Sequence, residues 1–390
     1  MTGTVEIAGS GIAGLTTGLA FARKGWRVCV HEQDDELRIL GAGIYIWENG
    51  LRVLDALGVA DAVTWGALPA WRHEKRDRGE VFAKSRLMPD FRLYVPLREA
   101  LLTALYEALL AAGGTVEFGS RAVAAEANGV LCFADGGYTR ADLIVAADGV
   151  NSPVRDSLGL LRRRHEIGQF AYRAMIPREP GELKTDVGRT HCENWNGSRR
   201  LLYAPCTDDF AYVQLTSLRG DARGNAVPLD RDFWCDLFPA LAWIIDRIPD
   251  DGRGDWLELI RTRGWARGCV ALVGDSASGQ PPFLGQGGGC AMMSGFVLAE
   301  AIDRAGDIET GLGEWQRRQR RFTEWVQRIA YWYGQLALLP PALRLAVFGA
   351  IGRSEALQAA TLFAAARRDP TAPEVWQPPA EVEIPVPIFH

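Results

Sequence analysis

Residues 5–32 read VEIAGSGIAGLTTGLAFARKGWRVCVHE, and this stretch decides the fold. A short apolar run meets the turn Gly9-Ser-Gly-Ile-Ala-Gly14, a helical pattern follows, and a second apolar run closes the stretch. In a strand–turn–helix, Gly9 allows the tight turn, Gly11 lets the backbone approach a pyrophosphate, and Gly14 lets the helix pack closely on the strand. The helix N-terminus then offers unpaired N–H groups and the positive end of its dipole to the anion.

Glu32 makes this turn more specific. It stands at the end of the second predicted strand, where a carboxylate accepts hydrogen bonds from a ribose diol. The glycine pattern alone is a weak signal, and a plain glycine-rich turn is the alternative interpretation. Because strand, helix, second strand and acidic residue follow in order, the stretch predicts a dinucleotide-binding site.

Length and composition are those of an ordinary globular enzyme. The chain has 390 residues, which allows two to three domains, with 48% hydrophobic and 23% charged residues. The formal net charge of −5 argues against a nucleic-acid surface. Basic clusters at 162–164 and 317–321 are more typical of solvated helix faces than of a polyanion site.

Cysteine and apolar patterns favour a cytoplasmic protein without membrane contact. The seven cysteines are scattered without a CxxC pair, which suits a reducing compartment rather than a disulfide framework, and the five histidines show no metal spacing. A strand predicted from Val5 leaves no room for a signal peptide. The apolar stretch 336–351 is interrupted by Pro340-Pro341 and Arg344, so we expect a helical hairpin against the body.

Two later apolar runs end in an acidic residue beside glycine. The first ends in Asp148-Gly149 and the second in Gly274-Asp275. A glycine-rich turn over 285–289 then precedes a helix predicted over 290–304, and a long aromatic-rich helix is predicted over 312–338. The chain therefore carries three phosphate- or ribose-type elements but a single GxGxxG pattern.

The order of these elements predicts an α/β fold with a discontinuous cofactor domain. We expect a Rossmann-like dinucleotide-binding domain interleaved with an antiparallel-sheet substrate domain, followed by C-terminal helices. The predicted boundaries are 1–70, 97–165 and 262–335 for the cofactor domain, 71–96 and 166–261 for the substrate domain, and 336–390 for the C-terminal helices and proline-rich tail.

The three elements favour FAD over a freely diffusing NAD. A NAD site needs one βαβ unit and a nearby acid–base pair, whereas an FAD stretched across the sheet uses all three elements. Asp275 would then accept from the ribityl hydroxyls, and the turn 285–289 would lay N–H groups at the pyrimidine edge of the ring. The dipole of the following helix would stabilise the anionic reduced flavin.

The trio of Gly9/Gly11/Gly14 with Glu32, Asp148-Gly149 with Arg155, and Gly274-Asp275 with Pro282 resembles the single-component (class A) FAD-dependent aromatic monooxygenases of the para-hydroxybenzoate hydroxylase type. The likeness covers roughly 3–335. It implies a dual FAD and NAD(P)H role for Asp148-Gly149, and contact of Arg98 with the ribityl chain and pyrophosphate. The predicted FAD-binding residues are Gly9, Gly11, Ile12, Ala13, Gly14, Glu32, Gln33, Arg38, Gly43, Arg98, Asp148, Gly149, Gly274, Asp275, Pro282, Gly285, Gly287 and Gly288.

The resemblance also implies the reaction. NADH or NADPH reduces FAD, O2 adds at C4a of the flavin, and the resulting hydroperoxide delivers an electrophilic OH to an electron-rich ring. The protein has to exclude water and orient the substrate, and it needs no nucleophilic side chain. No GxSxG elbow is present in the sequence. The partners implied are a small aromatic substrate, O2 and NAD(P)H; whether the chain is a monomer or a homo-oligomer stays open.

Stretches 41–54, 200–206 and 286–292 look more specifically like 2-methyl-3-hydroxypyridine-5-carboxylate oxygenase and its pyridoxate relatives. Two positions depart from that pattern: Trp71 stands where the relative carries a tyrosine, and Ser278 where it carries a histidine. The residues that the likeness places around the substrate are Arg200, Tyr212, Tyr45, Arg173, Pro282 and Trp71.

Each of these side chains also has a plainer interpretation. Arg200 either binds a substrate carboxylate in bidentate fashion or pairs with a neighbouring acid on an exposed strand. Tyr212 and Tyr45 either hydrogen-bond the substrate or fill the core as amphipathic aromatics. His191-Cys192-Glu193 is interpreted as a loop cluster rather than a metal site, and the tyrosines and tryptophans over 325–333 as packing.

The sequence therefore predicts an NAD(P)H-consuming flavoprotein that hydroxylates a small aromatic or heteroaromatic ring, such as a hydroxypyridine or hydroxybenzoate acid. Ring opening after oxygenation stays open. A first alternative is a hydroxylase of a larger aromatic natural-product scaffold, which a pocket widened at Trp71 and capped by the C-terminal helices would favour. Further alternatives are a flavin reductase or dehydrogenase and a non-catalytic FAD-bound interaction protein.

Overall fold

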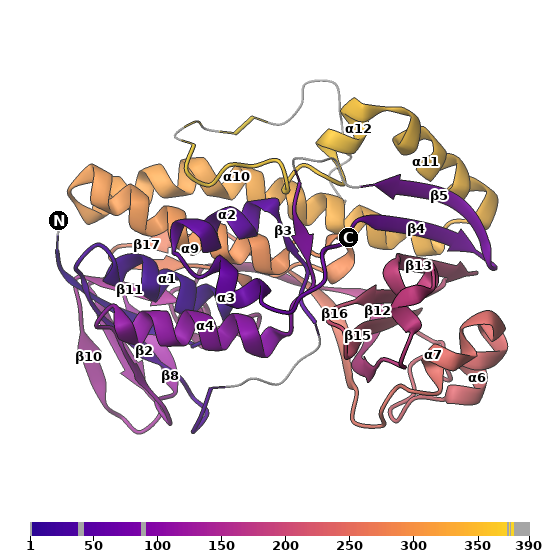
Figure 1. The fold of residues 1–390 in the computed structure, drawn as a ribbon. Coiled ribbons are helices and arrows are strands. Elements are labelled where there is room, and N and C mark those ends of the chain that lie inside the picture. The colour runs from indigo at the N-terminus through magenta and orange to yellow at the C-terminus, as the bar shows by residue number, and fades with distance from the viewer. Residues whose placement is uncertain (1, 38–42, 87–90, 373, 375, 378–390) are drawn as a thin grey trace.

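The computed structural model describes residues 2–37, 43–86, 91–372, 374, 376 and 377 (Figure 1). Arg38, a predicted cofactor ligand, lies outside the described residues.

A six-stranded sheet in the order β17-β18-β11-β1-β2-β7 forms one half of the molecule (Figure 1). Its strands are β1 (Thr4–Ala8), β2 (Arg27–His31), β7 (Thr115–Glu117), β11 (Leu143–Ala146), β17 (Ala266–Arg267) and β18 (Val270–Leu272). All neighbours pair in parallel except β17 with β18. The four residues of β11 are all buried, as expected for a parallel strand covered on both faces.

Helix α1 (Ile12–Ala22) confirms the predicted strand–turn–helix, and all of its residues are buried. It packs against α4 (Arg98–Ala111) and α9 (Gly287–Ala305), and α10 (Ile308–Gln335) runs along α9 (Figure 1). Helix α9 begins three residues before the predicted Cys290, so Gly287 to Gly289 form its first turn. Shorter helices complete this half: α2 (Glu48–Ala56), α3 (Ala60–Thr64), α5 (Pro153–Ser157), α8 (Asp275–Ser278) and the 3₁₀ turn η4 (Pro282–Leu284).

A seven-stranded sheet in the order β16-β12-β15-β14-β13-β4-β5 forms the other half (Figure 1). It is antiparallel except for the pair β13 and β4. The strands are β4 (Arg72–Asp77), β5 (Glu80–Arg86), β12 (Leu161–Pro177), β13 (His191–Asn196), β14 (Arg199–Pro205), β15 (Phe210–Leu218) and β16 (Arg253–Thr262). The cluster His191-Cys192-Glu193, predicted to be a loop, therefore lies on a central strand.

One face of this sheet is covered by α6 (Arg231–Leu237) and α7 (Ala242–Ile245), which enclose a separate apolar core around Trp234 and Ile244. The opposite face carries Tyr212, Ala204 and Cys206 and turns toward the parallel-sheet half. Two small sheets complete the described strands: β3 (Ile46–Trp47) with β6 (Leu93–Tyr94), and β8 (Ala122–Glu126) with β9 (Val130–Phe133) and β10 (Tyr138–Arg140). Strands β12 and β16 cross the predicted domain boundaries, and the division into domains stays a prediction.

The C-terminal region forms two helices, α11 (Pro341–Arg353) and α12 (Glu355–Ala360), beside β4 and β5 (Figure 1). Arg344 is fully buried; it donates to Asp77 Oδ2 over 2.5 Å and to the Gly197 carbonyl over 2.7 Å, so α11 is fastened to the sheet. Among the described residues, no helix combines the length and the apolar character needed to cross a membrane.

Candidate active site

A cavity of about 590 Å³ lies between the two halves of the molecule. Loops that follow β1, β11 and β18 meet at its edge, because the carboxyl ends of parallel strands share one side of a sheet. Most of the predicted site residues line this one cavity: Gly11, Ile12, Ala13, Gly43, Tyr45, Arg98, Gly149, Arg173, Arg200, Tyr212, Asp275, Pro282, Gly285, Gly287 and Gly288.

The glycine turn after β1 has the geometry predicted for it. Gly9 has a φ of +100° and donates its N–H to the His31 carbonyl over 2.7 Å. A Cβ on Gly14 would lie 1.9 Å from the Gly9 carbonyl oxygen, so only glycine allows this close packing. Glu32 is buried, and its Oε2 accepts from the Ser10 N–H over 2.9 Å and from Ser10 Oγ over 2.5 Å. Gln33, beside it, is exposed.

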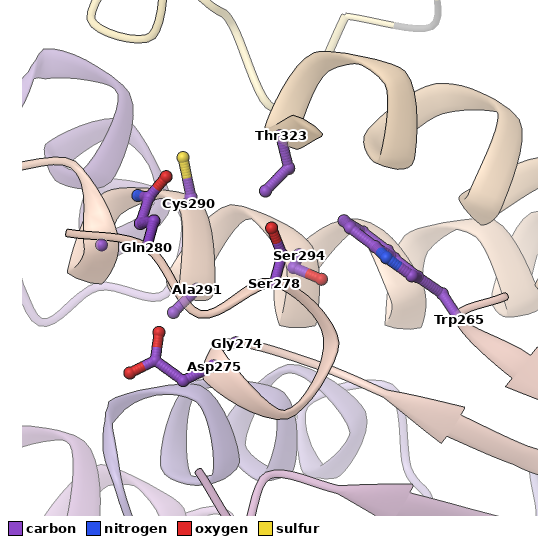
Figure 2. A pocket seen from close by; sticks show the side chains of 10 residues that line it. Trp265, Gly274, Asp275, Ser278, Gln280, Cys290, Ala291, Ser294 and Thr323 are labelled. Carbon is purple, nitrogen blue, oxygen red and sulfur yellow. The ribbon is translucent and has the colours of Figure 1, made fainter. Parts of the chain in front are cut away.

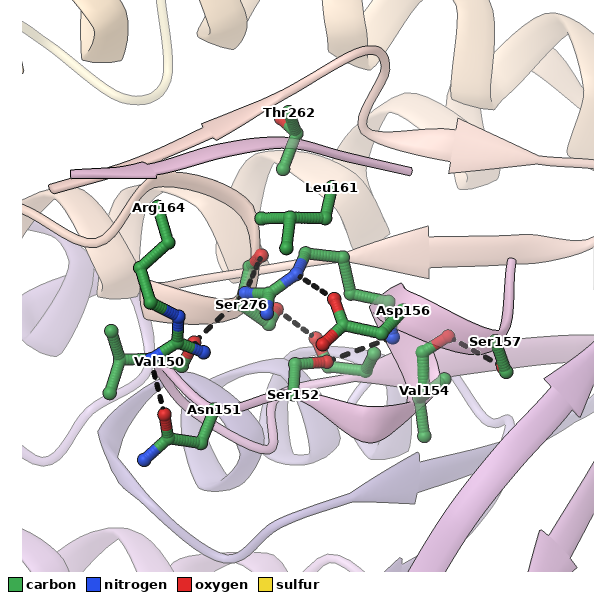
Figure 3. Close-up of polar contacts among 12 residues, drawn as sticks. Val150, Asn151, Ser152, Val154, Asp156, Ser157, Leu161, Arg164, Thr262 and Ser276 are labelled. Carbon is green, nitrogen blue, oxygen red and sulfur yellow. Dashed lines mark hydrogen bonds and ion pairs between the residues drawn. The ribbon is translucent and has the colours of Figure 1, made fainter. Parts of the chain in front are cut away.

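The second element, Asp148-Gly149, is tied to the third by a buried arginine. Asp148 Oδ2 accepts from the Val154 N–H over 3.2 Å, and burial raises the pKa of this carboxyl. Arg155 is fully buried and donates from Nη1 to the carbonyls of Val150, over 3.0 Å, and Ser276, over 3.4 Å. Figure 3 shows these carbonyls side by side, so the loops after β11 and β18 hold a fixed spacing.

Asp275 is the first residue of α8 and lines the cavity. Burial raises the pKa of its carboxyl, and the positive charges of Arg98 and Arg173 oppose that rise. Figure 2 shows a small second pocket, in which Asp275 lies near Gly274 and Ala291, and Ser278 lies near Ser294. Ser278, which departs from the pyridine-oxygenase pattern, thus faces Ser294 and Thr323 rather than the large cavity.

The glycines of the site differ in how much space surrounds the position of an added Cβ. Open space beside a glycine is where a bound FAD could approach the backbone. At Gly14, Gly274 and Gly285 an added Cβ would come within 3 Å of neighbouring atoms, so these glycines serve packing. At Gly11 and Gly149 an added Cβ would meet nothing within 4 Å. These open positions at successive strand ends form a cradle whose backbone a pyrophosphate and ribityl chain can approach.

The donor set matches FAD as well. The turn at Gly11 and the start of α1 would hold the pyrophosphate, Arg98 would reach it from α4, and Asp275 would accept from the ribityl hydroxyls. The N–H groups at the start of α9 would meet the pyrimidine edge of the flavin ring. When bound, FAD supplies the reduction by NAD(P)H and the activation of O2.

A buried charged cluster forms the substrate end of the cavity. Glu193 accepts from Lys75 Nζ over 2.7 Å, from Arg200 Nη1 over 3.1 Å and from Tyr333 Oη over 2.6 Å. Burial alone would raise the pKa of Glu193, but Lys75 and Arg200 outweigh it and lower the pKa to about 2. Arg200 is therefore paired with an acid, and the pair lies on buried neighbouring strands rather than on an exposed one.

Two histidines and two tyrosines border this cluster. Tyr45 Oη lies 3.1 Å from His191 Nδ1, and Tyr212 donates to Gln214 Oε1 over 2.9 Å. Burial raises the pKa of Tyr212 to about 12. His73 pairs in register with His191, and burial together with the nearby Lys75 lowers the pKa of His73 to about 4. Both tyrosines thus combine core packing with a polar contact at the cavity wall.

Two substrate-side predictions have different outcomes. Arg173 lines the cavity but forms an ion pair with Asp255. Trp71 does not line the cavity: it precedes β4 at the surface, and 70% of its area is exposed. The structure therefore does not bring Trp71 to this cavity, because residues 72–77 pair with β5 and β13 and leave position 71 outside the strand.

Sequence reasoning missed several lining residues, namely Trp47, His73, Lys75, Glu193, Tyr333, Leu362 and Phe363. His73 and Lys75 alternate on β4, so the period of a strand could have placed both on one face. The sequence pattern indicates a packing role for Tyr333, within the aromatic-rich helix, and a loop position for Glu193. Leu362 and Phe363 carry no local signal.

One group of potential metal ligands, Glu6, Cys29 and His31, occurs among the described residues. It lies on β1 and β2, away from the cavity-lining residues. His31 already has protein partners at both ring nitrogens, with Nε2 2.6 Å from Glu6 and Nδ1 2.9 Å from Ser120. We interpret the group as a hydrogen-bond network, and the expectation of no metal stays a prediction.

Comparison with known proteins agrees with this site. Residues 2–198 match the family model described as FAD binding domain. The chain is 39% identical, over 91% of its length and 93% of the relative, to a putative 2-heptyl-3-hydroxy-4(1H)-quinolone synthase of Rhodococcus erythropolis. It is 40% identical, over 90% of its length and 96% of the relative, to the 2-heptyl-3-hydroxy-4(1H)-quinolone synthase of Mycobacteroides abscessus.

Among solved structures, 2-methyl-3-hydroxypyridine-5-carboxylic acid oxygenase in its tetrameric form superposes with a TM-score of 0.85 at 34% identity, covering 95% of this chain and 97% of that one. The predicted α/β fold, with a Rossmann-like sheet, an antiparallel sheet and C-terminal helices, is confirmed. The chain belongs to the class A FAD-binding monooxygenases, the flavin-dependent family of aromatic hydroxylases.

Proposed function

We propose that this enzyme hydroxylates C3 of a 2-alkyl-4(1H)-quinolone. The observation that carries the proposal is the similarity, at 39% and 40% identity over about nine-tenths of the chain, to two 2-heptyl-3-hydroxy-4(1H)-quinolone synthases. The balanced reaction consumes the quinolone, NAD(P)H, a proton and O2, and it yields the 3-hydroxyquinolone, NAD(P)+ and water. This substrate is the larger aromatic scaffold of the first alternative rather than the small aromatic acid of the main prediction.

The charges at the substrate end support a neutral ring. Glu193 accepts from Nη1 of Arg200 and offsets the charge of the guanidinium, which leaves this arginine less available for bidentate binding of a substrate carboxylate. The cluster of Lys75, Arg200 and Glu193 keeps one net positive charge, since two cations face one carboxylate. A polar ring oxygen such as the 4-oxo group of a quinolone can accept from these donors without bringing a full negative charge.

The shape of the cavity supports a scaffold larger than a single ring. Its volume of about 590 Å³ is shared between the cofactor cradle at Gly11 and Asp275 and the end lined by Arg200 and Phe363. Leu362 and Phe363, just beyond α12, line it, so the C-terminal region closes one side. This is the capping that the larger-scaffold alternative requires.

The protein's own contribution is to position the ring and to exclude water. Phe283 lies 4.6 Å from the Arg200 guanidinium, and together with Pro282 it provides an apolar surface beside the start of α9. A ring held there would lie near the start of α9, where the N–H groups would hold the edge of the flavin. Such fixed placement lowers the entropic cost of the hydroxylation, and the apolar walls limit unproductive loss of the activated oxygen to water.

A second candidate substrate is a hydroxypyridine carboxylate. It is favoured by the 34% identity and TM-score of 0.85 to 2-methyl-3-hydroxypyridine-5-carboxylic acid oxygenase.

The test is NADH and NADPH oxidation by the FAD-loaded enzyme, with O2 uptake and peroxide followed together. The panel contains 2-heptyl-4(1H)-quinolone, 2-methyl-3-hydroxypyridine-5-carboxylate and 4-hydroxybenzoate. We expect the quinolone to accelerate oxidation with little peroxide release, and the two acids to have little effect. Acceleration by the pyridine acid alone, with tight coupling, would replace the proposal with the second candidate.

A further inference from the structure

We infer that Leu362 and Phe363, in the segment 360–369 called here the C-terminal wall, form the subsite for the alkyl tail of the substrate and limit the tail length. The inference rests on the proposed function, because it assigns one part of the proposed substrate to one part of the cavity.

The C-terminal wall belongs to the same cavity as the cofactor cradle. Leu362 and Phe363 are half-buried and line the cavity that Gly11 and Asp275 also line. The Phe363 ring packs edge-to-face against Trp47, with ring centroids 5.9 Å apart. Trp47 in turn donates from Nε1 to the Leu284 carbonyl over 3.2 Å, at the end of η4. An apolar surface therefore runs from the flavin-side turn to the C-terminal wall.

The C-terminal wall is fastened at both ends, so its side chains can act as a steric limit. Trp325 Nε1 on α10 donates to the Ala360 carbonyl over 2.9 Å. At the far end, Asp369 pairs with Arg52 on α2 over 3.7 Å, and Ala372 accepts from Arg318 on α10 over 2.5 Å. Figure 1 shows this segment close to α10, the helix whose Tyr333 lines the cavity.

The chemistry of this end of the cavity suits a hydrocarbon. The charged side chains Lys75, Glu193 and Arg200 lie on β4, β13 and β14. The titratable group that reaches Trp47 is His73, stacked at 6.1 Å between ring centroids, and burial beside Lys75 keeps it neutral at physiological pH. An alkyl chain meets aromatic and aliphatic groups there. Each buried methylene should strengthen binding about fourfold, the equivalent of about 0.8 kcal/mol.

The experiment uses a series of 2-alkyl-4(1H)-quinolones from methyl to undecyl with the FAD-loaded enzyme. The Kd of each is read from the change in the flavin absorbance spectrum, and kcat/KM from product formation. Variants are Phe363→Ala, which lengthens the subsite, and Leu362→Trp, which shortens it. Leu343→Ala is the matched control, because Leu343 lies on α11 with 56% of its area exposed. All variants are required to keep the wild-type flavin spectrum and Tm.

For the wild type we expect Kd to fall about fourfold per methylene up to a limiting length and then to level or rise. Phe363→Ala should move that limit to longer chains and Leu362→Trp to shorter chains, with a change of roughly 15-fold for two methylenes. Leu343→Ala should keep the wild-type profile. Binding of quinolones with the same length profile in all variants would overturn the inference alone. Failure of every quinolone to perturb the flavin would overturn the proposed function and the inference together.

Discussion

Glu193 sets the balance of charge in the buried cluster with Lys75 and Arg200. Its carboxylate lies between Lys75 and Arg200, and both cations lower its pKa, so it is ionised at neutral pH. A buried ion pair of this kind contributes little net stability, but removal of one partner leaves an uncompensated charge. The residue is therefore a sensitive place to test the preference for a neutral ring.

Glu193→Gln should change that preference. We expect the affinity for 2-methyl-3-hydroxypyridine-5-carboxylate to rise roughly 10- to 100-fold, because a freed Arg200 can form a charge-assisted hydrogen bond worth about 1.5–3 kcal/mol. The free energy of unfolding should fall by about 3–5 kcal/mol. Ligand titration followed by flavin absorbance gives the first quantity and urea unfolding the second. Glu166→Gln serves as the control, since its pair with Arg219 is more than half exposed. Unchanged affinity for the acid would contradict this account of Arg200.

His73 should make stability depend on pH. Its folded-state pKa is about 4, whereas an unfolded histidine titrates near 6.5, so the unfolded chain binds more protons between these values. Stability should therefore be full above pH 6.5 and fall as the pH drops toward 4, by up to about 1.4 kcal/mol per pH unit. Tm measured from pH 7.5 to 4.5 tests this expectation. The slope should be smaller in His73→Leu; an equal slope would show that other groups cause it.

At this scale, sequence reasoning located the cofactor side better than the substrate side. Gly9, Gly14 and Glu32 lie within one short stretch, so their spacing carries the whole signal. Lys75, Glu193 and Tyr333 come from β4, β13 and α10, and they meet only because β4 pairs with β13 across more than a hundred residues. No local pattern announces such a cluster.

Among the elements, the start of α1 separates cofactor binding from folding. Gly11 has an ordinary extended backbone, with φ −72° and ψ −175°, and a Cβ there meets open space. A Cβ on Gly14 would instead strike the Gly9 carbonyl oxygen at 1.9 Å. The two glycines lie three residues apart and should respond differently to the same substitution.

Gly11→Ala should leave the Tm of the apoprotein unchanged and weaken FAD binding roughly 10- to 100-fold, the loss of one hydrogen bond to a charged group. Gly14→Ala should lower the free energy of unfolding of the apoprotein by about 1–3 kcal/mol, because the added methyl group would clash with the Gly9 carbonyl oxygen. Fluorescence titration with FAD and thermal unfolding of the apoproteins measure both. If Gly11→Ala bound FAD normally, the pyrophosphate would not lie against this turn.

Most helices and strands could be predicted, because the spacing of apolar residues and the glycines at segment ends are signals within the segment itself. The helices predicted over 290–304 and 312–338 correspond to α9 and α10, with their ends displaced by a few residues. The misassigned segments depend on distant partners: 191–193 is a strand because β4 and β14 lie on either side of it. Gly287 to Gly289 are helical although glycine disfavours helix, since the turn at Gly285 and packing on Ile44 and Asn49 hold them.

Across the whole molecule, the cavity lies where the carboxyl ends of the parallel strands meet one face of the seven-stranded sheet. The order of the glycine and acidic motifs predicted the fold. It could not predict that residues 362 and 363, beyond the last of those motifs, return to the cavity. That return depends on Arg344, buried against Asp77, and on Trp325, which holds Ala360. The presence of Leu362 and Phe363 in the cavity wall is also what favours the proposed larger substrate over the small aromatic acid predicted from the sequence.

The most direct test of the proposed function is mass spectrometry of the product formed from 2-heptyl-4(1H)-quinolone under 18O2, with one equivalent of NADH or NADPH. We predict one molecule of 2-heptyl-3-hydroxy-4(1H)-quinolone per reductant oxidised, with a single 18O atom in the new hydroxyl group. Recovery of unaltered quinolone, with the reductant spent on labelled hydrogen peroxide, would contradict the proposal that this cavity hydroxylates a quinolone.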